Sequence, residues 1–261
     1  MQHLLEPGNE VPKVALVTGG ASGIGRAIAI KLSSEGIATV IADKDKFAAQ
    51  QLATEIGGLA LCADLRDAHA CEYVVEQTKE AYGAVDILIN NAGFQHVSSI
   101  EDFSPEIWND MIALMLTAPF LLTKYVWAGM KRKQWGRIVN IASIHGQIAS
   151  PFKAGYTSAK HGLVGFTKTA ALEGGEHGIT VNAVSPAYVR TPLVEKQIED
   201  QAGRHGISKE DVVSRIMLEP AAVKRLIEPH EVAGLVAYLC TDDAKSVTGA
   251  NLTMDGGWTA R

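Results

Sequence analysis

Short apolar runs alternate along the chain with longer segments in which apolar residues recur every three or four positions. The short runs are rich in β-branched and aliphatic residues, and several lack polar alternation, which is typical of strands covered on both faces. The expected strands lie at 14–19, 38–43, 59–64, 86–93, 137–143, 180–186 and 251–257. The helical patterns between them lie at 24–36, 45–57, 67–82, 104–134, 154–177 and 229–240.

This alternation predicts an α/β fold with a doubly wound parallel sheet of about seven strands and helices on both faces. The chain has 261 residues, of which 47% are hydrophobic, and it shows no internal repeat or low-complexity linker. One large core can therefore be buried. We expect a short lead-in over residues 1–12 and a single domain over 13–261.

Residues 190–228 interrupt the alternation with a charged, helix-rich stretch that contains Pro192 and Pro220. An insertion at the carboxyl edge of a parallel sheet lies where ligands bind. We therefore expect this stretch, called the lid segment below, to be a mobile substrate lid. The alternative is a pair of surface helices that only packs against the domain.

Composition and charge exclude several kinds of function. A net charge of −5 argues against nucleic acid or an anionic membrane as the partner. The histidines show no metal-binding spacing, and Cys62, Cys71 and Cys240 form no CxxC pair, as expected for reduced thiols in a cytoplasm. No stretch approaches about 18 uninterrupted apolar residues, and no signal peptide pattern opens the chain. We expect a cytoplasmic protein that acts on small molecules without a metal.

A glycine-rich loop, TGGASGIG, follows the first expected strand and opens the first helix. A strand, a glycine loop and a helix in this order are typical of a Rossmann-type site, in which the helix N-terminus binds a pyrophosphate. The context matters, because an isolated glycine pattern is weak evidence. The expected cofactor contacts in the loop are Gly19, Ser22, Gly23 and Ile24.

Two aspartates end the next two expected strands. Asp43 stands where a carboxylate accepts hydrogen bonds from a ribose diol. A 2′-phosphate there would meet like charge, so Asp43 favours NAD over NADP, although Lys44 and Lys46 weaken the argument. Asp64, followed by Leu65, either binds the adenine edge or caps the next helix.

The fourth expected strand ends in NNAG, where Asn91, Ala92 and Gly93 let a dinucleotide lie across the strand ends. Further on, Tyr156 and Lys160 stand four residues apart, on one face of a helix and thirteen residues beyond Ser143. An ammonium beside a phenol favours the phenolate, and so lowers a pKa that is normally about 10 toward the range useful for a base.

Together these motifs resemble the short-chain dehydrogenase/reductase family, in its order and at its spacings. The resemblance implies a homotetramer, a nicotinamide dinucleotide and a Ser–Tyr–Lys catalytic set. By it, Ser143 polarises the substrate oxygen, Tyr156 exchanges the proton, and Lys160 lowers the tyrosine pKa and holds the nicotinamide ribose. SPAYVRT at 185–191 resembles the stretch that cradles the nicotinamide, with alanine in place of the usual glycine. Its expected contacts are Pro186, Val189 and Thr191.

The chain departs from the family pattern at Met115, where the family usually has a catalytic asparagine. A methionine side chain does no polar work, but Pro119 lies four residues later and has no N–H. In an α-helix the carbonyl of Met115 would then be free to hold a water that links Lys160 to solvent. We therefore include Met115 in the catalytic set through its carbonyl. The alternative is a proline kink without catalytic meaning.

A narrower likeness concerns the substrate. The segments FQHV, SIHGQ, PFKAGY and TPLVEKQ resemble those of bacterial D-3-hydroxybutyrate dehydrogenases. The likeness implies that Gln95, His145, Lys153 and Gln197 bind the substrate carboxylate beside Ser143 and Tyr156. Tyr188 stands where that group often has tryptophan. Independently, a lysine with two amides and an imidazole offers the donors that a carboxylate requires.

We therefore expect NAD-dependent interconversion of (R)-3-hydroxybutyrate and acetoacetate, with a small hydroxy or keto acid as the substrate. One alternative is a 3-oxoacyl-thioester reductase of the same family. Another, of a different class, is a dinucleotide-binding sensor without catalysis, since a fold does not determine a function.

Overall fold

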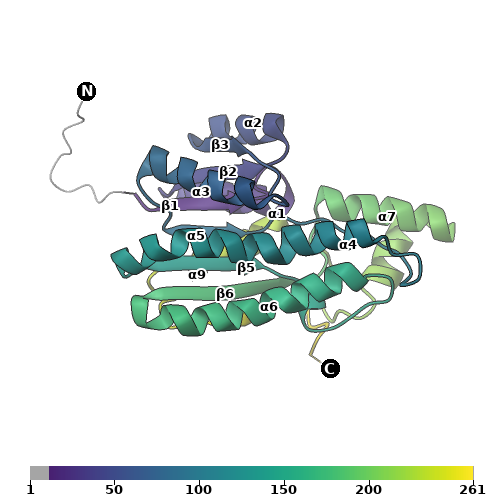
Figure 1. Cartoon of the computed structure of the whole chain (residues 1–261). Coiled ribbons are helices and arrows are strands. Elements are labelled where there is room, and N and C mark those ends of the chain that lie inside the picture. Colours follow the sequence, from purple (N-terminus) through teal and green to yellow (C-terminus); the bar gives the residue numbers. More distant parts are fainter. Residues whose placement is uncertain (1–11, 261) are drawn as a thin grey trace.

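A seven-stranded parallel sheet of order β3-β2-β1-β4-β5-β6-β7 forms the centre of the computed structural model, which describes residues 12–260 (Figure 1). The strands are β1 (Val14–Thr18), β2 (Ala38–Asp43), β3 (Leu59–Cys62), β4 (Ile87–Asn90), β5 (Gly136–Ile141), β6 (Ile179–Pro186) and β7 (Asn251–Met254). The predicted doubly wound sheet is confirmed. Most of the expected lead-in, residues 1–11, lies outside the described residues.

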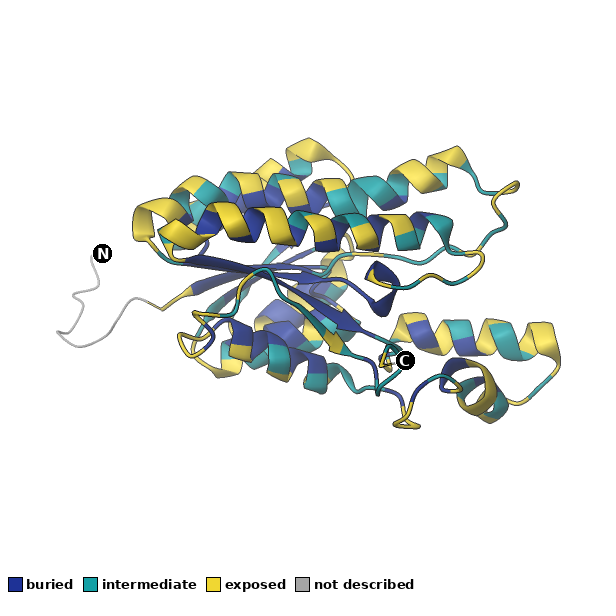
Figure 2. Ribbon diagram, turned by 90° about the horizontal axis from the view of Figure 1, so that it is seen from below, coloured by how far each residue is buried: buried dark blue, intermediate teal, exposed yellow. Residues whose placement is uncertain are grey.

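Helices cover both faces of the sheet. They are α1 (Gly23–Ser34), α2 (Lys46–Ile56), α3 (Ala68–Tyr82), α4 (Pro105–Ile112), α5 (Ala118–Lys133), α6 (Ala154–Gly174), α7 (Pro192–His205), α8 (Lys209–Asp211) and α9 (Pro229–Leu239). One buried cluster joins the sheet to α1, α2 and α9, and a second joins it to α3, α5 and α6. Figure 2 shows the resulting layers, with buried residues on the strands and exposed ones on the outer faces of the helices.

Local signals in the sequence explain where several helices begin and end. Asp45 accepts a hydrogen bond from the N–H of Ala48 at the start of α2, and Asp67 accepts one from His69 at the start of α3. Both helices end at a glycine in the left-handed region, Gly57 with φ 66° and Gly83 with φ 84°. Because Asp67 is the cap of α3, the capping role considered for Asp64 is wrong.

The order of the strands reverses between β1 and β4, since the chain runs outward from β1 to β3 and then returns to β4. Such a reversal opens a crevice at the carboxyl ends of the strands, because the connections on either side diverge. The glycine loop after β1 and the NNAG segment after β4 both lie at this edge. The topology therefore places the two motifs on the two sides of one crevice.

The helical pattern at 104–134 forms one continuous helical run with a change of register in its middle. Between α4 and α5 lies a π-helical turn at Ala113–Thr117, closed by a bond from the N–H of Ala118 to the carbonyl of Ala113. The argument from Pro119 assumed an α-helical register, and that premise is wrong here. In the wider register a donor at position 119 would face the Leu114 carbonyl, so Pro119 does not by itself free the carbonyl of Met115.

The same run, Pro105–Lys133, is long and apolar enough to cross a membrane by length and composition, since it contains an 18-residue window with a mean hydropathy of 1.5. In this fold it belongs to the helix layer. Leu122, Val126 and Met130 are buried in the cluster that α5 shares with the sheet and α3. We therefore interpret it as a core helix of the layered fold.

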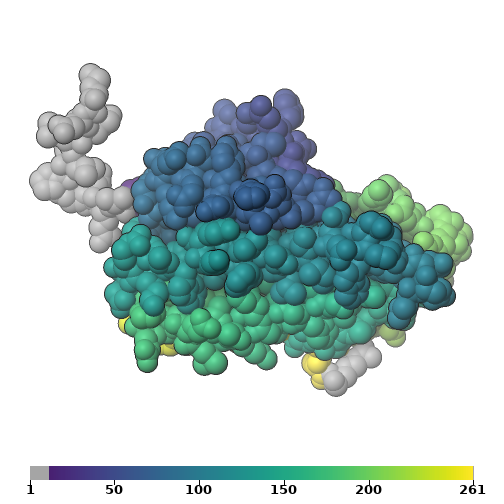
Figure 3. Space-filling view, viewed as in Figure 1, coloured from purple at the N-terminus to yellow at the C-terminus, as the bar shows by residue number. Residues whose placement is uncertain are grey.

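The lid segment contains α7, α8 and a π-helical turn at Val212–Met217, which agrees with its helix-rich pattern. It has a small apolar cluster of its own, which includes Val194, Ile198, Val212, Met217 and Leu226. Figures 1 and 3 show α7 beyond the end of the sheet, where the lid segment forms one end of the molecule.

Candidate active site

The backbone of the glycine loop packs closely against the NNAG segment and against itself, which leaves no room for side chains at two glycines. Gly19 has φ 58°, and a Cβ there would lie 2.8 Å from the Cα of Ala92. A Cβ on Gly25 would lie 2.2 Å from the carbonyl oxygen of Gly19. Asn91 holds the loop, because its Nδ2 donates to the carbonyls of Thr18 and Gly19 at 2.9 Å each. The loop thus presents the N-terminus of α1 to the crevice, as pyrophosphate binding requires.

A cleft of about 460 Å³ runs along this edge of the sheet. Its lining includes every residue that the sequence assigned to the cofactor: Gly19, Ser22, Gly23, Ile24, Asp43, Asp64, Leu65, Asn91, Ala92, Gly93, Tyr156, Lys160, Pro186, Val189 and Thr191. The glycine loop lies beside strand ends that carry small residues. The cleft therefore offers backbone N–H donors for a phosphate and, next to them, open space for the rest of a dinucleotide. These residues fit a nicotinamide dinucleotide, and their individual roles remain predictions.

Asp43 ends β2 at the wall of this cleft. Its Oδ2 accepts a hydrogen bond from the N–H of Ala21 at 3.0 Å, and its Oδ1 accepts one from Asp45 at 3.0 Å. The two bonds orient the carboxylate and connect it to the glycine loop, and each oxygen keeps capacity for a further donor. A ribose diol is such a donor. Lys44 also lines the cleft, so a cation lies beside the carboxylate.

Two charged residues that line the cleft, Arg66 and Asp110, were not predicted from the sequence. Arg66 donates through Nε and Nη2 to the carboxylate of Asp64 and through Nη1 to Asp110 on α4. The hydrogen bond from Arg66 lowers the pKa of Asp64, and all three residues line the cleft. The adjacency of Asp64 and Arg66 is visible in the sequence, but Asp110 is 44 residues away and gives no local signal.

Ser143, Tyr156 and Lys160 meet in the middle of the cleft. Ser143 follows β5, and its Oγ accepts a hydrogen bond from the N–H of His145 at 3.1 Å. Tyr156 and Lys160 lie on α6, and the Lys160 Nζ is 5.6 Å from the centre of the tyrosine ring. The Lys160 Nζ donates to the carbonyl of Ile141 at 2.7 Å, which fixes the ammonium between α6 and the end of β5.

Burial dominates the electrostatics of this pair. Desolvation raises the pKa of Tyr156, with the hydrogen bond to Ser143 acting in the opposite direction, and lowers the pKa of Lys160 to about 8. The lowering of the tyrosine pKa by Lys160 that the sequence predicted is not seen in this structure, where the pKa of Tyr156 is raised. The physical reason is that each charged form loses hydration, since Lys160 is buried and Tyr156 is half-buried in the wall of the cleft.

A second, smaller cavity of about 70 Å³ opens beside the catalytic residues. Its lining brings together all seven residues that the sequence assigned to the substrate: Gln95, Ser143, His145, Lys153, Tyr156, Tyr188 and Gln197. They come from the loop after β4, the β5–α6 connection, α6, the segment after β6, and α7. Ala187, Leu193 and Val194 add apolar surface from the lid side.

The smaller cavity favours an anion. Lys153 carries its only positive charge, no carboxylate side chain lines it, and the described part of the chain gives Lys153 no ion-pair partner. Burial lowers the pKa of Lys153, and its Nζ lies 5.6 Å from the centre of the Tyr188 ring. Burial, followed by the charges of Lys153 and His161, lowers the pKa of His145 to about 4. His145 is therefore a neutral hydrogen-bonding group at physiological pH.

Met115 lines neither cavity and is 1% exposed. It packs in a small apolar cluster with Met111 and Ala159, against Tyr156. Its Sδ would lie 3.2 Å from a Cβ on Gly93, so its side chain supports the floor of the cleft. The structure thus places the methionine behind the catalytic residues as a packing group. The role predicted for the Met115 carbonyl required an α-helical register, whereas Met115 lies in the π-helical turn.

Comparisons with known proteins agree with this geometry. Residues 13–202 match the family model of the short chain dehydrogenases. The chain is 44% identical over 256 residues to D-beta-hydroxybutyrate dehydrogenase of Rhizobium meliloti (strain 1021), with 95% of this chain and 99% of that protein covered. It is 38% identical to acetoacetyl-CoA reductase of Shinella zoogloeoides, with 94% and 98% covered.

A solved structure shows the same fold. It is a variant of actinorhodin polyketide ketoreductase with NADPH, which superposes with a TM-score of 0.91 at 36% sequence identity. The alignment covers 96% of this chain and 98% of the other. The chain thus shares its fold with a ketoreductase and is similar in sequence to both hydroxybutyrate dehydrogenases and reductases.

Proposed function

Because the chain belongs to the short-chain dehydrogenase/reductase family, we propose that this oxidoreductase interconverts (R)-3-hydroxybutyrate and acetoacetate with NAD as the cofactor. We further propose that it works in the cytoplasm as a homotetramer. The family assigns the chain to oxidoreductases that act on a CH–OH group with a nicotinamide cofactor. The choice of substrate rests on the smaller cavity.

The observation that carries this proposal is the position of Lys153. It lies in a small cavity that also contains Ser143 and Tyr156, with Gln95 and Gln197 as neutral donors. A carboxylate bound by the lysine and the amides would leave a hydroxyl a few bonds away, beside the catalytic hydroxyls. A short 3-hydroxy acid has this separation between its two functional groups. The likeness to the D-beta-hydroxybutyrate dehydrogenases supports the same choice.

The residues of this chain have distinct parts in the reaction. Tyr156, as phenolate, takes the proton from the substrate hydroxyl, and Ser143 donates a hydrogen bond to the same oxygen as it becomes a carbonyl. The nicotinamide supplies the hydride acceptor. Lys160, fixed by the Ile141 carbonyl, holds positive charge near the phenolate. When the cofactor is bound, Lys160 would also donate to the nicotinamide ribose.

A thioester reductase remains the nearest alternative, since acetoacetyl-CoA reductase is among the relatives. A thioester carries no carboxylate beside its carbonyl group. Lys153 would then stand in the cavity as a half-buried cation without a partner for its charge. The cavity therefore favours the free acid.

The test is an assay of purified protein with each enantiomer of 3-hydroxybutyrate and with NAD and NADP in turn. NADH formation from the R enantiomer alone, with NAD preferred, is the expected result. Parallel assays with acetoacetyl-CoA and NADPH would detect the alternative, and faster turnover there than with acetoacetate would overturn the proposal. Binding of NADH without turnover of any hydroxy acid would indicate a non-catalytic sensor.

A further inference from the structure

The two ends of the lid segment lie side by side. Val189, just beyond β6, pairs with Ile227, just before α9, in an isolated parallel bridge. The N–H of Arg190 donates to the carbonyl of Ile227 at 2.8 Å, and the N–H of Ile227 donates to the carbonyl of Tyr188 at 3.0 Å. The two ends of the lid segment are therefore bound to each other. A second attachment lies near the returning end, where the N–H groups of Ala222 and Val223 donate to the carbonyl of Gly256 at 2.7 and 2.8 Å.

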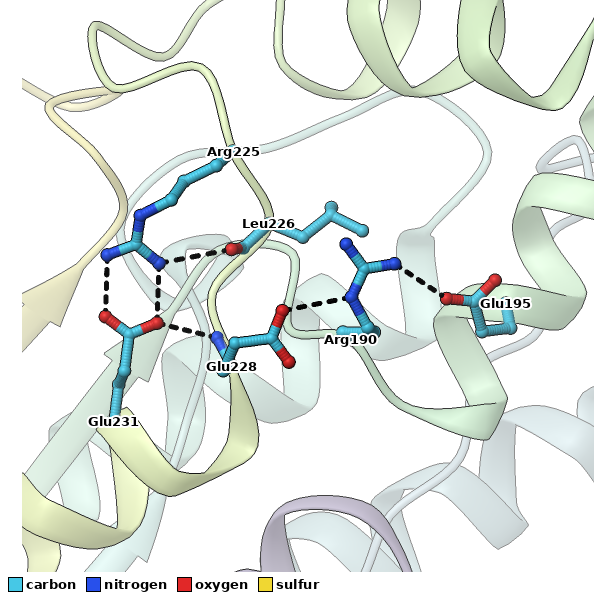
Figure 4. Close-up of polar contacts among 6 residues, drawn as sticks. All are labelled: Arg190, Glu195, Arg225, Leu226, Glu228 and Glu231. Carbon is cyan, nitrogen blue, oxygen red and sulfur yellow. Dashed lines mark hydrogen bonds and ion pairs between the residues drawn. The ribbon is translucent and has the colours of Figure 1, made fainter.

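Arg190 connects the paired ends to helices on either side (Figure 4). Its Nε donates to Glu228, the residue before α9, at 3.0 Å. Its Nη1 donates to Glu195, in the first turn of α7, at 3.2 Å. One guanidinium thus joins the first helix of the lid segment to a helix that packs on the sheet. An arginine suits this task because its planar fork presents several donors in fixed directions.

A second arginine secures the returning end. Arg225 donates through both Nη atoms to the carboxylate of Glu231 at 2.6 and 2.7 Å. The same carboxylate accepts the N–H of Glu228 at 2.7 Å, in the first turn of α9. Figure 4 shows the two arginines on opposite sides of Glu228. We call the five residues Arg190, Glu195, Arg225, Glu228 and Glu231 the lid clasp.

The neighbours of Arg190 line both cavities, although Arg190 itself lines neither. Tyr188 lies in the wall of the smaller cavity, whereas Val189 and Thr191 lie in the wall of the larger cleft. Val194, in the first turn of α7 beside Glu195, lines both. A movement of α7 about Arg190 would therefore change the shape of the substrate cavity.

We propose that Arg190, acting through Glu195, is a positioning residue that holds α7 against the substrate cavity. The proposal rests on the function proposed above only where it concerns the substrate. The Arg190–Glu195 pair is half exposed, with side chains 52% and 48% accessible, so each partner keeps much of its hydration. Such a pair shifts an equilibrium by about 1.5- to 5-fold. That is strong enough to favour the closed position and weak enough to open in each catalytic cycle.

The test compares wild-type enzyme with Glu195→Gln, which keeps the size of the side chain and leaves the Arg190–Glu228 pair intact. We expect the KM for (R)-3-hydroxybutyrate to rise about 1.5- to 5-fold while kcat stays within about twofold. Hydrogen exchange of the backbone amides of α7, measured without substrate, should accelerate by a similar factor. Salt at 1 M should raise the wild-type KM toward that of the variant, because exposed pairs are screened.

Arg215→Met is the matched control. Arg215 lies in the lid segment and pairs with Asp211 one helical turn away, outside the lid clasp. It should change neither KM nor exchange in α7. Unchanged KM or unchanged exchange in Glu195→Gln would overturn the proposal, as would equal effects in the control. If the wild type does not oxidise 3-hydroxybutyrate, the proposed function fails, and the exchange comparison still decides whether Glu195 holds α7.

Discussion

At the scale of single residues, the chemistry depends on one phenol hydroxyl. Tyr156 is placed beside Ser143 and Lys160, and Tyr156→Phe removes only the atom that exchanges the proton. We expect turnover to fall by about 10²- to 10⁴-fold, the usual contribution of general acid–base catalysis, while NADH binding stays nearly intact. Steady-state kinetics and a fluorescence titration with NADH check the two parts. Turnover within threefold of wild type would show that another group exchanges the proton.

The proposed recognition of the substrate carboxylate depends mainly on one residue, Lys153. Lys153→Ala removes the only cation of the smaller cavity. A charge-assisted hydrogen bond contributes roughly 1.5–3 kcal/mol, so kcat/KM for 3-hydroxybutyrate should fall about 10- to 150-fold, mainly through KM. Gln95→Ala and Gln197→Ala should cost less, because neutral donors form weaker bonds with a carboxylate.

The methyl ester of 3-hydroxybutyrate is the control substrate, since it carries no negative charge. Its kcat/KM should respond little to Lys153→Ala. An equal loss with the acid and the ester would mean that Lys153 supports the cavity without recognising the carboxylate, and the proposed substrate would then be wrong.

At the scale of elements, the π-helical turn at Ala113–Thr117 decides how Met115 and Pro119 act. The turn shifts the register, so Pro119→Ala supplies an N–H that faces the Leu114 carbonyl. We expect Pro119→Ala to keep turnover within about twofold, with an unchanged solvent isotope effect. Met115→Leu should also keep most activity, because the volume is nearly conserved in a buried cluster.

These two variants discriminate between packing and proton relay. A loss in Pro119→Ala that is concentrated in the proton-transfer step would restore a catalytic role for the Met115 carbonyl. A loss in Met115→Leu alone would instead indicate that the shape of the side chain behind Gly93 and Tyr156 matters.

At the scale of the whole molecule, we expect the buried ammonium of Lys160 to destabilise the fold. Lys160 is 4% exposed, and burial lowers its pKa from 10.5 to about 8. Between these values the unfolded chain binds more protons than the folded one, so the contribution of Lys160 to the free energy of unfolding rises with pH. Below pH 8 the buried ammonium lowers the free energy of unfolding by its full amount. That amount is about 3 kcal/mol, because each unit of difference in pKa corresponds to about 1.36 kcal/mol.

Lys160→Met should therefore unfold at higher denaturant concentration than the wild type at pH 7, although it loses activity. The gain should shrink as the pH rises from 8 to 10.5, because the wild-type lysine becomes neutral. Denaturant unfolding of both proteins at pH 7 and pH 10 measures the difference. A difference that does not depend on pH would show that the ammonium is fully compensated by the Ile141 carbonyl and its surroundings.

The sequence by itself determined the order of strands and helices, because periodicity, N-terminal caps such as Asp45 and Asp67, and terminal glycines act within a few residues of the chain. It also determined that the glycine loop and the NNAG segment share one edge, since parallel strands end together. The residues of the smaller cavity were predictable only through the resemblance, because five separate parts of the chain supply them.

Only the tertiary structure decided the features that depend on distant partners or on burial. Arg66 meets Asp110 across 44 residues, and Arg190 meets Glu228 across 38, and neither spacing carries a local signal. The π-helical turn depends on how α4 and α5 pack on their neighbours, so a helical pattern could not reveal it. The pKa values of Tyr156 and Lys160 follow from desolvation, which exists only once the chain has folded around them.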